Sequence, residues 1–272
     1  MRSTQAHGAE IERGELNWKT LSVTYEGPIL RVWLDRPEKR NALNGDALEE
    51  IAALFGALAT DFVTRVVILG GRGPSFCAGA DRTDPPGHAR LAASSDASER
   101  ERRWVAQVGL RAARAIEDAE VVTIARVHGH AVGGGVVLAA ACDFRVAAEG
   151  TMFHVPEVDL GIPLTWGGAP RLAREVGAAR AKELILLCDR FDAAAAERYG
   201  LVNRVVPADQ LDAAVDDWAR RLAAKPDWAL HMTKSQFQAY GVTRTLGDVS
   251  TMDGDLLAGA TSEDPSRFAW RR

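Results

Sequence analysis

The sequence predicts an α/β protein with a helical C-terminal region. Short β-rich runs alternate with stretches of helical spacing as far as residue 207, and beyond it helical patterns follow one another with no strand signal. The 272 residues are enough for one large core with a smaller appendage. We therefore divide the chain into a flexible N-terminal tail (1–20), an α/β core (21–206) and a helical region (207–272).

Composition excludes several classes of protein. Hydrophobic residues make up 47% and charged residues 26%, as in ordinary globular domains, and the net charge of −4 speaks against a nucleic-acid partner. The three cysteines are far apart and form no C-x-x-C pair, which predicts neither a disulfide framework nor a zinc site and fits a reducing cytoplasm. Charged residues interrupt the most apolar stretch, Val121–Ala148, so no membrane span is expected.

The N-terminal half of the core opens with a predicted hairpin. Leu21–Tyr25 and Ile29–Leu34 are β-rich runs joined by a Glu-Gly-Pro turn signal. Asn44 is placed to cap a helix that extends to about residue 58, whose apolar residues recur at spacings of three and four. The run Val66–Leu69 follows as a buried strand, and the Pro-, Ala- and Ser-rich segment Asp84–Ser98 is predicted to be a surface loop that could act as a lid.

The same reasoning places the later elements. Strands are expected at Val121–Val127, Phe144–Ala147 and Val202–Pro207, and helices at Arg102–Glu117, Val136–Cys142, Ala178–Leu187, Phe191–Tyr199, Ala208–Ala224, Asp227–Tyr240 and Leu246–Leu257.

Two turns between these elements are rich in small residues. The glycines at 133–135 join a strand to a helix, where backbone N–H groups can approach a ligand and the helix end favours an anionic oxygen. The alternative is that the glycines only let the helix pack closely on the sheet. The spacing does not fit the G-x-G-x-x-G pattern of dinucleotide sites. The turn at 76–81 (F-C-A-G-A-D) could present a second N–H.

These two turns, together with the preceding R-P-E-K-R-N-A-L-N segment (36–44) and the later Cys142-Asp143 pair, resemble the crotonase (enoyl-CoA hydratase/isomerase) superfamily. The resemblance runs from about Leu21 to the C-terminus. It implies a spiral of ββα units followed by helices that drive formation of a homotrimer or a dimer of trimers. It also implies an acyl-CoA thioester as the bound partner, with no metal and no cofactor other than the CoA of the substrate.

The resemblance also assigns the reacting groups. The backbone N–H groups of Ala78 and Gly134 correspond to an oxyanion hole that stabilises a thioester enolate. Val137 stands where the family's hydratases carry their first catalytic glutamate, and Glu157, in a Pro-Glu pair before Leu-Gly-Ile-Pro, matches the second. Trp166 stands where hydratases carry small residues around the water site; it either fills that space or is an ordinary core aromatic.

Contacts to CoA are assigned in the same way. Basic residues after Arg-Pro and near the C-terminus correspond to groups around the CoA phosphates and adenine. The assigned residues are Lys39, Arg40, Ala42, Ala80, Asp81, Phe268 and Arg271. The segment before Phe268 is about four residues shorter than the family pattern, and the basic C-terminus could equally be a solvated end of the chain.

With one glutamate, the expected activity is movement of a double bond in an enoyl-CoA, because a single carboxylate can remove and return a proton whereas hydration uses two. The alternatives are a hydratase that uses one glutamate, another crotonase reaction such as thioester hydrolysis, and a non-catalytic acyl-CoA-binding protein. Three further residues near these motifs could substitute for the missing acid, with Asp159 as the possible second carboxylate: His130, His154 and Asp159. Lone histidines beside strands are more often structural.

Overall fold

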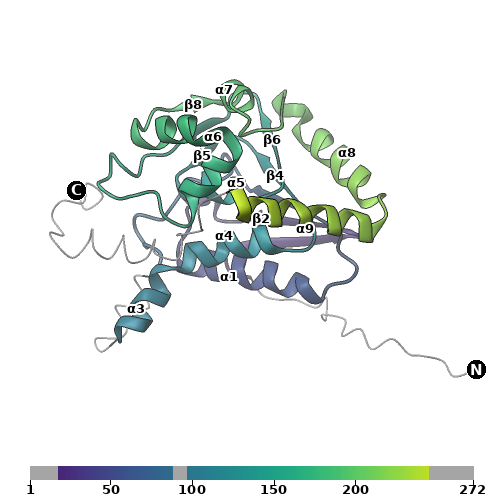
Figure 1. The fold of residues 1–272 in the computed structure, drawn as a ribbon, viewed down its shortest axis with the longest axis horizontal. Coiled ribbons are helices and arrows are strands. Elements are labelled where there is room, and N and C mark those ends of the chain that lie inside the picture. The colour runs from purple at the N-terminus through teal and green to yellow at the C-terminus, as the bar shows by residue number, and fades with distance from the viewer. Residues whose placement is uncertain (1–17, 88–96, 245–272) are drawn as a thin grey trace, which may run out of the picture.

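The computed structural model describes residues 18–87 and 97–244 and contains two β-sheets surrounded by helices (Figure 1). The larger sheet has the order β1-β2-β3-β4-β6-β9 and the smaller has the order β5-β7-β8. The strands are β1 (Leu21–Glu26), β2 (Ile29–Leu34), β3 (Val66–Gly71), β4 (Val122–Val127), β5 (His130–Val132), β6 (Phe144–Ala148), β7 (Met152–His154), β8 (Phe191–Asp192) and β9 (Arg204–Val206).

The larger sheet begins with a hairpin and continues as parallel strands. β1 and β2 pair antiparallel, with Leu21 opposite Leu34, and Gly27 supplies the left-handed turn residue (φ 61°). All the following pairs are parallel, and each of the six residues of β3 is buried. A parallel sheet is covered on both faces, which is why β3 is a continuous apolar run.

Helices cover the two faces of this sheet. The helices are α1 (Gly45–Ala57), α3 (Glu99–Ala106), α4 (Val108–Asp118), α5 (Gly134–Ala141), α6 (Gly168–Leu186), α7 (Ala193–Arg198), α8 (Leu211–Ala223) and α9 (Asp227–Arg244), with 3-10 turns at η1 (Pro37–Lys39), η2 (Leu58–Thr60) and η3 (Ala208–Gln210). Alternate β3 residues face two separate cores: Val67 packs with α1, α4 and α5, and Val66 packs with α8. The small sheet lies beside α6 and α7 (Figure 1).

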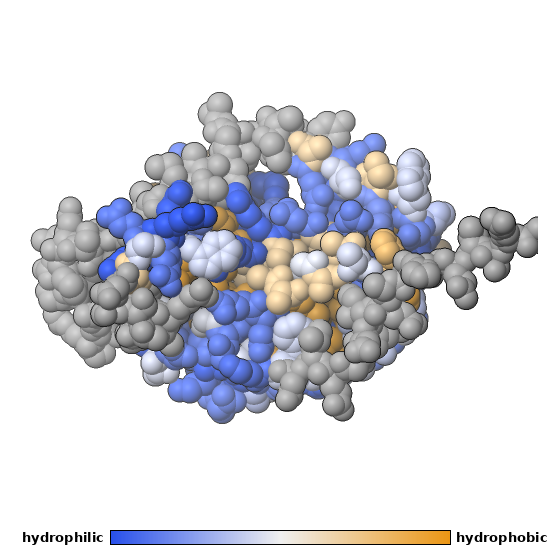
Figure 2. Space-filling model, turned by 90° about the horizontal axis from the view of Figure 1, so that it is seen from below, coloured by the Kyte–Doolittle hydropathy of each residue, from blue (hydrophilic) through white to orange (hydrophobic). Residues whose placement is uncertain are grey.

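The described C-terminal helix, α9, is tied to the middle of the large sheet. Lys234 is buried, and its Nζ donates to the Val121 carbonyl at 2.8 Å and pairs with Asp143 at 2.9 Å. Seen from below the view of Figure 1, the molecule presents hydrophilic areas around a hydrophobic area near the centre of this face (Figure 2). No helix in the described ranges is long and apolar enough to cross a membrane.

The predicted hairpin, the central strands and the Asn44 cap are confirmed; the Asn44 side chain accepts a hydrogen bond from Ala47 N–H at 3.0 Å. The predicted helix over 102–117 is two helices that meet at Gln107. The short strands of the smaller sheet were not predicted, because two or three residues carry too little pattern. The expected helix Leu246–Leu257 lies outside the described residues, as does most of the expected tail.

The prediction for α6 was wrong at its start. The helix begins at Gly168, ten residues before the predicted Ala178, and Gly177 interrupts it with a backbone of φ 78° and ψ 154°. That conformation is open to glycine and strained for other residues, so the helical pattern is broken at this point in the sequence.

Two glycine-to-alanine changes should shift stability in opposite directions. A Cβ at Gly177 or at Gly56 would meet nothing within 4 Å, so neither change creates a clash. Gly177→Ala should lower the free energy of unfolding by at least about 1 kcal/mol through backbone strain. Gly56→Ala, inside α1, should raise it by about 0.5 kcal/mol. Denaturant unfolding of both variants checks this, and equal effects would contradict the assigned backbone at Gly177.

Candidate active site

The first turn of α5 contacts three different partners at three consecutive glycines. A Cβ added at Gly133 would overlap the Glu157 carboxylate, one at Gly134 would overlap the Trp166 indole, and one at Gly135 would lie 2.7 Å from the Cys77 carbonyl oxygen. Gly133 also has a positive φ of 49°. Glycine is therefore required here for close approach as well as for the turn.

The second small-residue turn lies directly beside this helix end. Cys77 N–H donates to the His130 carbonyl at 3.0 Å, and Val132 N–H donates to the Cys77 carbonyl at 3.0 Å. A Cβ at Gly79 would lie 2.8 Å from the Val132 carbonyl and 3.8 Å from the Gly134 nitrogen. The structure thus brings together the two turns that the sequence singled out.

Two backbone N–H groups at this junction have no acceptor within the part of the chain that the structure describes. One belongs to Gly134, the first residue of α5, and the other belongs to Ala80. First-turn N–H groups have no partner inside their own helix and are open to a ligand. The Ala78 N–H, predicted as a donor, instead donates to the Arg40 carbonyl at 2.9 Å.

The contrast between the two alanines follows from a short stretch of parallel pairing. Leu43 N–H donates to the Gly79 carbonyl and Asp81 N–H donates to the Leu43 carbonyl, both at 2.8 Å, so Ala80 lies between paired positions and its own N–H is left over. Sequence reasoning placed Ala80 among the CoA contacts only. The motif could not separate the two alanines, because the pairing that uses Ala78 involves a residue 38 positions earlier, Arg40.

Glu157 is the carboxylic acid at this junction. Its side chain contacts Gly133, and its Oε2 is buried with no hydrogen-bond partner among the described residues. Burial raises the pKa of Glu157 to about 7, and a hydrogen bond with its own backbone lowers this pKa only in part. A carboxyl group with a pKa near neutrality can both take and return a proton.

An apolar wall lies one helical turn beyond Gly133, the glycine that contacts Glu157. Val137, one turn into α5, is buried, and a Cβ at Gly168 would lie 2.7 Å from its Cγ2 and 2.8 Å from Leu164 Cγ. The position that holds a second acid in two-glutamate hydratases therefore carries a hydrocarbon side chain. The Val137 side chain itself cannot activate a water molecule.

Trp166 completes the wall in an unusual backbone conformation. The residue is buried and has φ 60°, in the left-handed region that is rare for bulky side chains, and Gly167 follows with φ 70°. Such a conformation costs on the order of 1–3 kcal/mol and persists where other contacts hold it. The indole packs on Gly134 of α5 and on Gly109 of α4, where an added Cβ would overlap its ring atoms.

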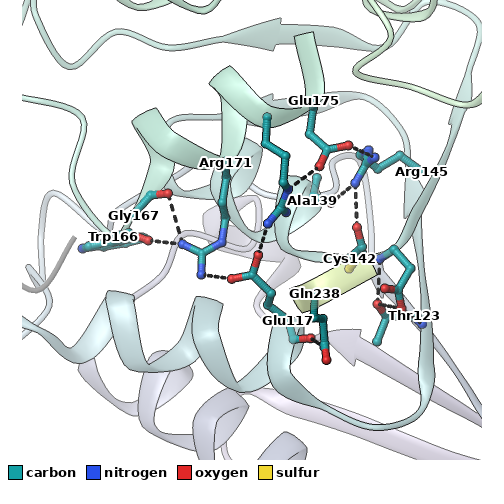
Figure 3. Close-up of polar contacts among 12 residues, drawn as sticks. Glu117, Thr123, Ala139, Cys142, Arg145, Trp166, Gly167, Arg171, Glu175 and Gln238 are labelled. Carbon is teal, nitrogen blue, oxygen red and sulfur yellow. Dashed lines mark hydrogen bonds and ion pairs between the residues drawn. The ribbon is translucent and has the colours of Figure 1, made fainter. Parts of the chain in front are cut away.

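Arg171 holds this backbone from within α6. Its Nη1 donates to the Trp166 carbonyl at 2.9 Å and to the Gly167 carbonyl at 3.1 Å, and its Nη2 pairs with Glu117 at 2.5 Å (Figure 3). Burial alone would raise the pKa of Glu117, but the charges of Arg171 and Arg174 outweigh this and lower it. The pairing of Arg171 with Glu117 was not predicted, because the two residues are 54 positions apart in the sequence.

The residues predicted around CoA divide into two kinds. Lys39 and Arg40 are exposed, with Lys39 Nζ 3.3 Å from the Thr83 hydroxyl. Asp81 is buried and pairs with Arg36 at 2.8 Å. Burial opposes ionisation, but bonds from Thr83 and Arg36 lower the pKa of Asp81 to about 2. The Asp81 carboxylate thus holds the turn through its bonds to Arg36 and Thr83.

The other residues singled out in the sequence have the following surroundings. Ala42 is half-buried, and its carbonyl accepts a hydrogen bond from Arg36. His130 is 3.3 Å from the Ser75 hydroxyl, and His154 is 3.0 Å from the Cys188 carbonyl, so both have structural partners. Asp159 is exposed. Phe268 and Arg271 lie outside the described residues, and residues 18–87 and 97–244 contain no cluster of side chains suited to a metal ion.

The fold and the site define a protein with two free backbone donors beside one buried carboxylic acid. The model of the enoyl-CoA hydratase/isomerase family matches residues 24–269, and the chain belongs to this family. Its fold is that of the crotonase superfamily, as solved structures show. An enoyl-CoA hydratase from Mycobacterium avium subsp. paratuberculosis has a TM-score of 0.78 and 31% identity, over 90% of this chain and 95% of that one.

Two further similar proteins are named or described with CoA thioesters. The chain is 37% identical over 219 residues to a crotonyl-CoA hydratase of Syntrophomonas wolfei, covering 80% of this chain and 81% of that protein. The structure of a putative enoyl-CoA hydratase from Thermobifida fusca, solved in complex with acetoacetyl-CoA, has a TM-score of 0.73 and 31% identity over 89% of this chain and 93% of that one.

The raised pKa of Glu157 predicts a specific dependence of stability on pH. Because the folded-state pKa of about 7 lies above the ordinary value of 4.5, folding takes up a proton between these two pH values. The stabilisation is complete below pH 4.5 and is lost as the pH rises through 7. Relative to Glu157→Gln, the wild type should lose on the order of 3 kcal/mol of unfolding free energy over this range. Denaturant unfolding of both proteins from pH 4 to 8 measures this difference, and parallel curves would contradict the raised pKa.

Proposed function

We propose that this protein isomerises the double bond of an enoyl-CoA, with Glu157 as the single acid–base residue. The observation that carries the proposal is the Glu157 carboxyl group, whose Oε2 is buried without a hydrogen-bond partner among the described residues, beside a helix turn that carries the apolar Val137. Moving a double bond needs one group that removes a proton and returns it. Hydration in the family's two-glutamate pattern uses a second group to handle water.

The thioester carbonyl oxygen is the group suited to the two free donors. Placed on the N–H groups of Gly134 and Ala80, it would hold the negative charge that develops on losing an α-proton, and one such donor typically contributes about 2.7–4 kcal/mol at the transition state. This assignment replaces Ala78 by Ala80 and keeps Gly134. Because a helix N-terminus favours negative charge, α5 adds to the stabilisation.

The proposed reaction balances on a single carboxylate. Glu157 takes a proton from C2 of a 3-enoyl-CoA, giving a dienolate whose oxygen lies on the two N–H groups. As the carbonyl reforms, the double bond moves from C3–C4 to C2–C3, and the same carboxylic acid returns its proton to C4. A pKa of about 7 suits both steps near neutral pH, because neither protonation state is strongly disfavoured.

The remaining parts of the proposal concern CoA and assembly. Lys39 and Arg40 are exposed on the segment whose carbonyl groups pair with the Cys77–Asp81 turn, which suits them to CoA phosphates. Phe268 and Arg271 are proposed contacts for the adenine end. A homotrimer or a dimer of trimers without a metal or redox cofactor, in the cytoplasm, completes the proposal.

Two other activities stay in view. The relative from Syntrophomonas wolfei is named a crotonyl-CoA hydratase, which favours hydration as the second candidate, with Glu157 working alone. The apolar wall at Val137 and Trp166 argues against an ordered water there. The same wall would also suit a protein that binds acyl-CoA without turning it over.

A paired assay distinguishes an isomerase, a hydratase and a protein that only binds acyl-CoA. Wild-type protein should convert 3-enoyl-CoA to 2-enoyl-CoA, and Glu157→Gln should lower kcat by about 10²–10⁴-fold while calorimetric binding of acyl-CoA persists, because only the proton transfer is removed. Asp159→Asn is the matched control, since this carboxylate is exposed and two residues away. Hydration of 2-enoyl-CoA without isomerisation, or tight binding without turnover, would contradict the proposal.

A further inference from the structure

We propose that Trp166 sets the size of the acyl group that this site accepts, by filling a slot between α4 and α5 into which a longer chain would otherwise extend. The inference rests on the proposed function for the place of the thioester. It concerns the acyl group, which the proposed reaction leaves open.

The slot is formed by two glycines on neighbouring helices. An added Cβ at Gly109 would overlap Trp166 Cδ2, Cε2 and Nε1, and one at Gly134 would overlap Cζ3, with Cε3 and Cη2 at 2.8 Å. The indole thus lies with one ring on each helix and is only 8% exposed. Any side chain at either glycine would displace it, so both helix surfaces are shaped to this ring.

The slot lies beside the reacting atoms. Gly134 contributes one of the two free N–H groups, and the neighbouring Gly133 contacts the Glu157 carboxylate. A thioester carbon held at this N–H would have its acyl chain leaving within reach of the indole. The ring packs on the side of Gly134 where a side chain would lie, whereas the N–H of a first-turn residue points out of the helix end, so the ring leaves the donor free.

Polar contacts to the backbone of Trp166 fix the indole in the slot. Arg171 binds the carbonyls of Trp166 and Gly167, and Glu117 fixes Arg171 from α4, the same helix that carries Gly109. The partly buried ion pair between Arg171 and Glu117 therefore joins the backbone that aims the indole to the helix that forms one wall of the slot. A wall fixed in this way defines a sharp limit on size, because the interior cannot yield smoothly to a bulkier group.

Binding of saturated acyl-CoA esters, which the protein would not turn over, tests whether Trp166 limits the length of the acyl group. Wild-type protein should bind butanoyl-CoA at least tenfold more tightly than octanoyl-CoA by calorimetry. Trp166→Ala should reverse or abolish that ratio, and Trp166→Phe, which keeps part of the ring, should fall between them. Asp159→Asn is the control that should leave the ratio unchanged, because this carboxylate is exposed and forms no part of the proposed site.

The outcomes are distinguishable from those of the isomerase assay. Equal binding of the two esters by the wild type, or a ratio that Trp166→Ala and Trp166→Phe leave unchanged, would overturn the role of Trp166 whether or not the protein is an isomerase. Should Trp166→Ala not fold, judged by its denaturant transition, Trp166→Leu replaces it, and the same shift toward octanoyl-CoA is required.

Discussion

The site depends on the close packing allowed by three glycines at the start of α5. Because residues 133, 134 and 135 have no side chains, one helical turn contacts the Glu157 carboxylate, the Trp166 indole and the Cys77 turn at once. This places a free N–H, a carboxylic acid and an aromatic wall against one helical turn. A Cβ at any of the three positions would overlap the group that packs there.

The second constraint is a set of buried charges that joins elements far apart in the chain. Glu117 of α4 pairs with Arg171 of α6, and its backbone carbonyl accepts a hydrogen bond from Gln238 of α9 at 2.6 Å (Figure 3). Nearby, Arg145 of β6 pairs with Glu175 at 2.6 Å. Burying charges costs desolvation, so such pairs add specificity of arrangement more than net stability. Here the arrangement includes the strained backbone of Trp166.

Local patterns were sufficient to predict most of the fold. The hairpin follows from two β-rich runs around a Gly-Pro turn, α1 from the Asn44 cap and its apolar spacing, and the strand–glycine–helix unit from the triplet. The small sheet was beyond such patterns, because its strands have two or three residues each. The early start of α6 was also missed, because a helix broken at Gly177 does not read as one element.

The residues of the site could be predicted from the sequence, but the hydrogen bonds and ion pairs between them could not. Glu157, Gly134 and Val137 were identified by resemblance to a family pattern, and the two turns do lie together in the structure. Which alanine keeps a free N–H depends on pairing with a segment 38 residues away, and the hold of Arg171 on Trp166 depends on Glu117, 54 residues away from it. Neither leaves a signal in one sequence, because both depend on contacts that form only in the folded chain.

The central claim is that one carboxyl group, that of Glu157, removes a proton from C2 and returns it at C4 without addition of water. Conversion of a 3-enoyl-CoA that carries deuterium at C2, followed by NMR, measures this transfer directly. We expect wild-type protein to move the double bond with deuterium appearing at C4, and the conversion to be at least about a hundredfold slower with Glu157→Gln. Equal conversion by both proteins, or addition of water in place of double-bond movement, would contradict the claim.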